Sequence, residues 1–110
     1  SMIIRGGIPK PLRGTAPAVP GAPLADENAL KAFHFLVDCK TVWVRIVNTG
    51  ANPLRIFPQK PPQLDPASWL DYYELAASEA VEGLFEFDNL WLAGVGGTTA
   101  FKALLGLRVI

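Results

Sequence analysis

Apolar and polar positions alternate along much of the chain from residue 41 onward. The segment Thr41–Asn48 is rich in β-branched and aromatic residues, which favour strands. One face of this predicted strand carries the apolar residues Val42, Val44 and Ile46. The following Thr49–Pro53 has the composition of a turn. We therefore expect Leu54–Phe57 to return as the second strand of a hairpin.

The C-terminal third shows the same alternation. It predicts strands at Leu84–Phe87, Leu90–Val95 and Thr98–Ile110, with a tight turn at Gly96–Gly97 between the last two. The last strand places on one face the residues Phe101, Ala103, Leu105, Leu107 and Val109. Strands that recur about every 8–12 residues are typical of an antiparallel sandwich or barrel.

Residues 66–82 fit either a helix or a strand. Asp65–Pro66 is a favourable helix start and Gly83 a favourable helix end. The alternation around the paired tyrosines instead favours a strand over Leu70–Ala76, with a turn at Ala77–Glu79. We predict the strand and keep the helix as the alternative.

The first 25 residues differ from the rest. They contain five of the ten prolines and four of the ten glycines, and no acidic or aromatic residue. Proline fixes φ and removes an amide donor, so this segment should be extended rather than helical or an interior strand. A short helical turn capped by Asp26 should follow. We therefore divide the chain into an extended Pro/Gly-rich arm over residues 1–32 and a β-sandwich domain over residues 33–110. A disordered leader is the alternative to an arm that holds a neighbour.

Composition excludes several classes of function. The chain has 110 residues, half of them apolar, and its ten basic and ten acidic residues cancel. Zero net charge argues against direct nucleic-acid binding. One Cys and one His exclude a disulfide framework and any metal site built from several such ligands. No apolar run is long enough for a membrane span. We expect no cofactor, no metal, no nucleic acid and no membrane partner.

Charge is nevertheless unevenly distributed. Residues 1–60 carry a net charge of +5 and residues 61–110 a net charge of −5. If the fold separates the two halves into two faces, copies of the chain could attract one another.

Candidate catalytic groups are few. Residues 94–99 are rich in glycine but lack the lysine of a phosphate-binding loop. His34 and Cys39 lie five residues apart, which puts them on opposite faces of one strand. Three glutamates could form a carboxylate pair, although solvated positions explain them equally well: Glu79, Glu82 and Glu86. We assign no catalytic residue and predict that the protein is not an enzyme. An enzyme of unrecognised type would need His34 together with Cys39 or a glutamate.

The predicted core is small. The hydrophobic core of a 78-residue domain without a disulfide or metal contributes only about 3–5 kcal/mol of stability. Its apolar C-terminal strand would be prone to aggregation if its edge were exposed. Both features indicate oligomerisation. The expected partner contacts are Ile3, Ile4, Arg5, Ile8, Leu12, Arg13, Leu107, Val109 and Ile110.

Short motifs add a resemblance. Residues 45–56, together with Tyr73–Leu75 and Asn89–Gly94, resemble small β-sandwich proteins of tailed bacteriophage virions. The shared pattern is a strand ending in an Asn-x-Gly turn, a returning strand, a tyrosine strand and a Leu-Trp strand followed by a glycine turn. The resemblance covers residues 41–110. It implies a jelly-roll-like sandwich that decorates capsids or builds tails, and that forms symmetric oligomers with extended arms.

These features predict a non-enzymatic virion structural protein, made in the host cytoplasm, that acts as a capsid decoration or auxiliary subunit. Its partners would be further copies of itself, with a trimer favoured, and other virion proteins such as the major capsid protein. The alternative is a carbohydrate-binding module that stacks sugars on exposed aromatic rings. Its candidate residues are Trp69, Tyr72 and Tyr73.

Overall fold

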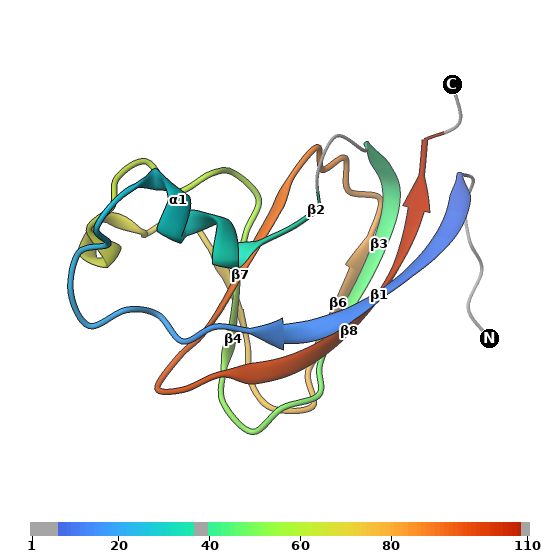
Figure 1. Ribbon diagram of the computed structural model, residues 1–110. Coiled ribbons are helices and arrows are strands. Elements are labelled where there is room, and N and C mark those ends of the chain that lie inside the picture. The colour runs from blue at the N-terminus through green and yellow to red at the C-terminus, as the bar shows by residue number, and fades with distance from the viewer. Residues whose placement is uncertain (1–6, 37–39, 109–110) are drawn as a thin grey trace.

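Two antiparallel sheets of four strands each pack face to face in the computed structural model, which describes residues 7–36 and 40–108 (Figure 1). Sheet A contains, in spatial order, β1 (Ile8–Ala16), β8 (Thr99–Leu107), β3 (Thr41–Asn48) and β6 (Ala80–Gly83). Sheet B contains β2 (His34–Leu36), β7 (Leu90–Gly94), β4 (Leu54–Phe57) and β5 (Tyr73–Leu75). The helical turns are α1 (Glu27–Leu30), η1 (Lys31–Phe33) and η2 (Pro66–Ser68). The predicted all-β sandwich is confirmed.

Several predicted elements appear with the expected bounds. The strands over Thr41–Asn48 and Leu54–Phe57 are β3 and β4, although they lie in different sheets and so form no hairpin ladder. The Asp26 carboxylate caps α1 by accepting a hydrogen bond of 3.0 Å from the Ala29 N–H. The predicted inner face of β8 is buried at Phe101, Ala103 and Leu105.

Leu84–Phe87 was predicted as a strand, and this prediction is wrong: the nearest strand is β6, which ends at Gly83. Thr41, the first residue of β3, binds the backbone of this segment with its side chain and with its own N–H, which donates to the Phe87 carbonyl at 3.0 Å. Its hydroxyl donates to the Phe85 carbonyl at 2.7 Å and accepts from the Phe87 N–H at 2.9 Å. Alternation therefore identified the segment's two faces but not its hydrogen-bond partner.

The ambiguous residues 66–82 combine both kinds of structure. They begin as the short helical turn η2, which Asp65 caps, and continue as the strands β5 and β6. A turn joins these strands at Ser78, whose φ is 70°. The strand expected over Leu70–Ala76 is present only as Tyr73–Leu75, because the preceding residues belong to the loop that follows η2.

The proline-rich N-terminal segment belongs to the sandwich over residues 8–16. These residues form β1, which pairs with β8 along its full length at the edge of sheet A (Figure 1). Proline is compatible with an edge strand where its missing donor faces away from the neighbour. Pro9 and Pro11 therefore remove two donors from the open edge of β1. The predicted boundary at residue 32 thus does not coincide with the start of the sheets.

The hydrophobic residues form two separate cores. The inter-sheet core fills the space between the two sheets and consists of Ala16, Leu36, Val44, Ile46, Leu54, Ile56, Leu75, Leu90, Leu92, Phe101, Ala103 and Leu105. The outer core lies on the far side of sheet B and consists of Leu30, Phe33, Phe57, Trp69, Trp91 and Ala93. Successive residues of β7 point alternately into the two cores, so all five are buried.

The outer core is covered by segments of the same chain. Val19 and Leu24, from the stretch after β1, pack against it together with Tyr72. The Val19 N–H donates to the Gly94 carbonyl at 2.7 Å, and the Leu24 N–H donates to the Leu64 carbonyl at 2.9 Å. The stretch after β1 therefore holds its own sheet B at these positions rather than a neighbour.

Asn48 connects the sheets at one end of the sandwich. Its side chain is fully buried, and both its amide group and its oxygen form two hydrogen bonds. The amide donates to the carbonyls of Asn52 (2.8 Å) and Leu75 (3.0 Å), and the oxygen accepts from the Gly50 N–H (3.1 Å) and the Thr99 hydroxyl (2.9 Å). A side chain on Gly50 would collide with Thr99, so the turn after β3 requires glycine.

Candidate functional site

The predicted partner contacts gather on β1 and β8 as far as the structure describes them. Ile8 and Leu107 face each other in the register of the two strands, and Ile8 remains 56% exposed. Leu12 and Leu107 are half-buried against the inter-sheet core, so they already contribute to the fold. The other five contacts lie outside the described residues: Ile3, Ile4, Arg5, Val109 and Ile110.

Arg13 is brought opposite a cation that sequence reasoning missed. It is the direct register partner of Lys102 on β8, and both side chains are exposed. Like charges directly opposite one another destabilise a strand pair. No acidic group of residues 7–36 or 40–108 lies within ion-pair distance of either cation, whereas five other cations of the described chain have an acidic partner. Only the β1–β8 register reveals this pair.

Two shallow hollows flank these cations. One has a volume of about 400 Å³, and its other lining residues are Pro11, Leu12 and Ala103. The second has a volume of about 330 Å³, and its other lining residues are Gly14, Thr15, Thr49, Ala100 and Phe101. The surface therefore combines apolar contact area, two hydroxyl groups and two uncompensated positive charges. Such a surface suits an acidic partner with apolar side chains.

The three candidate stacking aromatics do not form a platform. Trp69 is only 3% exposed; its ring meets Phe33 and Phe57 edge-on, and its Nε1 donates to the Gln63 carbonyl at 2.7 Å. Tyr72 is half-buried beneath the Arg55 guanidinium, whose centre lies 4.3 Å from the ring. Tyr73 alone is exposed. Because Trp43 and Trp91 are also buried, no tryptophan offers a free ring face.

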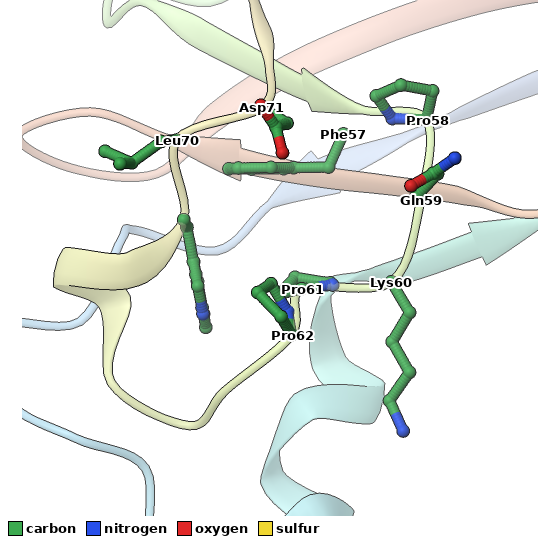
Figure 2. A pocket seen from close by; sticks show the side chains of 9 residues that line it. Phe57, Pro58, Gln59, Lys60, Pro61, Pro62, Leu70 and Asp71 are labelled. Atoms are coloured by element: carbon green, nitrogen blue, oxygen red, sulfur yellow. The ribbon is translucent and has the colours of Figure 1, made fainter.

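A pocket opens beside the outer core, between the loop that follows β4 and the residues after η2 (Figure 2). It has a volume of about 370 Å³, with the aromatic residues Phe57 and Trp69 among its lining. The rest of the lining is Pro58, Gln59, Lys60, Pro61, Pro62, Leu70 and Asp71. In Figure 2 the Lys60 side chain extends away from the Phe57 ring. Its ammonium group pairs with the Glu27 carboxylate at 2.9 Å. The pocket thus has a mixed lining, with two aromatic residues, three prolines and a leucine beside the polar Gln59, Lys60 and Asp71.

The residues considered for catalysis have separate structural partners. His34 stacks on Trp91 with ring centroids 4.1 Å apart, and its Nε2 lies 2.9 Å from Asn89 Oδ1. Cys39 falls outside the described residues. The three glutamates are held apart: Glu79 accepts from the Ala76 N–H, Glu82 pairs with Arg45 and Glu86 pairs with Arg108. Among the described residues, no group of three metal-ligating side chains comes together.

Comparison with known proteins identifies no relative. No family model, curated protein or solved structure matches the chain at a significant level. Within the described residues, no helix has the length and apolar character required to cross a membrane.

Proposed function

We propose that the protein is a non-enzymatic virion structural protein, a capsid decoration or auxiliary subunit that works as an oligomer. The observation that carries this proposal is the strand order, β1-β8-β3-β6 in one sheet and β2-β7-β4-β5 in the other. This order supports the jelly roll, the eight-stranded double-sheet architecture found in viral capsid domains, lectins and cupins. The step from fold to role is an argument by analogy, and the resemblance of residues 41–110 to phage virion proteins adds to it.

The side chains at the candidate sites favour a structural subunit over a cupin or a lectin. A cupin centre needs several histidines, whereas the single histidine, His34, is engaged with Trp91 and Asn89. A sugar-stacking lectin needs exposed aromatic faces, whereas Trp69 is buried and Tyr72 lies under Arg55. A structural subunit requires only surfaces that other subunits can cover, and sheet A offers such a surface around Arg13 and Lys102.

In this proposal the N-terminal segment, which forms β1, still contacts a neighbouring subunit. Val19 and Leu24 pack on their own chain, so the contact with another subunit falls to exposed side chains of β1, among them the predicted contacts Ile8 and Arg13. Pro9 and Pro11 limit uncontrolled strand addition at the same edge. The arm therefore acts through its side chains rather than by adding a strand.

Light scattering coupled to size-exclusion chromatography tests the oligomer over a wide range of protein concentration. We expect a closed oligomer, with a trimer favoured. An Ile8→Asp variant should associate more weakly while keeping the melting temperature of the wild type. A wild-type chain that stays monomeric at every concentration would contradict the proposal.

A further inference from the structure

An acidic and apolar strip lies at the open edge of sheet B. Leu70 is 75% exposed and Tyr73 is 64% exposed, and between them the Asp71 carboxylate is also exposed. No cation of the described residues pairs with Asp71. The strip thus has two large apolar side chains and an uncompensated negative charge within four residues. We call residues 70–73 the acidic strip.

The outer side of β1 and β8 has the opposite charge, and a shallow hollow there includes the exposed Pro11. Arg13 and Lys102 face each other in the register, and neither pairs with an acidic group of the described residues. The hollow beside them is lined by Pro11, Leu12 and Ala103. We call this surface the basic face. It belongs to sheet A, whereas the acidic strip continues into β5 at the edge of sheet B. The two surfaces belong to opposite layers of the sandwich, so one copy cannot bring them together.

We propose that the acidic strip of one copy docks on the basic face of a second copy of this chain. This inference rests on the proposed oligomer and names the two surfaces that build it. Charge complementarity selects the occupant, because Asp71 supplies the charge that Arg13 and Lys102 lack. The contact is head-to-tail, so each copy uses both surfaces, and the assembly closes into a ring when the rotation between copies permits.

The apolar groups supply most of the affinity in this arrangement. Exposed ion pairs contribute little free energy, whereas burial of Leu70 and Tyr73 in the hollow removes apolar surface from water. The charges set the register of the two surfaces and the rate of encounter. Association should therefore weaken when salt is added, because salt screens exposed charges.

Sedimentation velocity of charge-reversed variants tests the docking. The double variant Arg13→Glu/Lys102→Glu reverses the basic face, and Asp71→Lys reverses the acidic strip. We expect each variant to raise the dissociation constant of self-association at least about tenfold. The triple variant that combines all three changes restores opposite charges across the contact. It should therefore recover a substantial part of the lost affinity.

A matched control separates this contact from the effect of net charge. Lys31→Glu/Lys40→Glu changes the net charge by the same amount as the basic-face double variant, at exposed positions on η1 and before β3. It should leave self-association unchanged, and all variants should keep the wild-type circular dichroism spectrum and melting temperature.

Three outcomes would overturn the inference. If wild-type oligomers persist in both reversed variants, the docking is wrong while the proposed oligomer stands. If the basic-face variant dissociates but Asp71→Lys does not, or if the triple variant recovers nothing, the acidic strip is not the partner surface. A monomeric wild type would overturn the docking and the proposed oligomer together.

Discussion

The outer sides of the two sheets differ in what covers them. On sheet B, the stretch after β1, the helical turns and the loop after β4 cover a second hydrophobic core that contains Trp69 and Trp91 (Figure 1). On sheet A, the corresponding side of β1 and β8 exposes Arg13 and Lys102. The outer side of sheet B therefore carries a second aromatic core, whereas the outer side of β1 and β8 carries two cations without an acidic partner among the described residues.

This difference predicts that one set of residues determines the stability of the fold and the other set determines self-association. Residues of the outer core bury large apolar surfaces, so their loss should unfold the protein. Exposed residues of the basic face make few contacts within the chain, so their loss should change stability little and association strongly. The variants below test this separation, from the largest expected effect on folding to the smallest.

Removal of the Trp69 side chain should cause the largest loss. Trp69→Ala deletes a buried ring and the hydrogen bond to Gln63, which should cost about 3–5 kcal/mol of the free energy of unfolding. Urea denaturation followed by circular dichroism measures the change. The control is Tyr73→Ala, in the same segment but exposed, which should cost no more than about 0.5 kcal/mol. Equal losses in the two variants would contradict the assignment of the outer core.

Asn48→Ala should destabilise both sheets at once. The change leaves the buried carbonyl of Leu75 and the Thr99 hydroxyl without their partner, at a cost of roughly 2–4 kcal/mol. Thermal unfolding followed by calorimetry measures it. Thr49→Ala, at an exposed neighbouring position, is the control and should have a small effect. A loss below about 1 kcal/mol would show that water replaces the Asn48 hydrogen bonds.

Two tryptophans of the outer core provide a finer comparison. The Trp69 indole N–H donates to Gln63, whereas the buried Nε1 of Trp91 has no hydrogen-bond partner among the described residues. Replacement by Phe removes similar volume at both positions. Trp69→Phe should therefore cost about 1 kcal/mol more than Trp91→Phe. Denaturation midpoints of the two variants measure the difference, and the reverse order would show that packing outweighs hydrogen bonding here.

Neutralisation of the basic face should have the smallest effect on folding. Arg13→Gln/Lys102→Gln removes two like charges that face each other across β1 and β8, so stability should stay within about 0.5 kcal/mol of the wild type. Denaturation at low protein concentration measures the monomer. A loss above about 1 kcal/mol would show that these side chains support the sheet itself.

Much of the fold could be predicted from local patterns, and the failures have physical causes. Thr41–Asn48 and Leu54–Phe57 were predicted correctly as strands because alternation is a local signal, but their pairing as a hairpin was wrong because they lie in different sheets. Leu84–Phe87 alternates equally well, but whether it pairs as a strand depends on Thr41, about 44 residues away in the chain. The role of β1 was missed because prolines exclude an interior strand but permit an edge strand.

The candidate site was less predictable than the fold. Arg13 was identified from its place in the N-terminal segment, but its pairing with Lys102 depends on the β1–β8 register, which no local pattern contains. Trp69 and Tyr72 were stacking candidates only in the alternative carbohydrate-binding hypothesis, because composition cannot distinguish a ring in a second core from a ring on the surface. The charge halves also mix in space, because β3 of the basic half lies between β8 and β6 of the acidic half.

Hydroxyl-radical footprinting of the wild-type chain at low and high protein concentration tests the central claim most directly. Side chains of the basic face and of the acidic strip should become protected together as the protein associates, most clearly at Leu70 and Tyr73. Leu84, an equally exposed apolar residue outside both surfaces, should keep its labelling rate. Association that protects Leu84 while Leu70 and Tyr73 stay labelled would contradict the claim that these two surfaces join neighbouring copies.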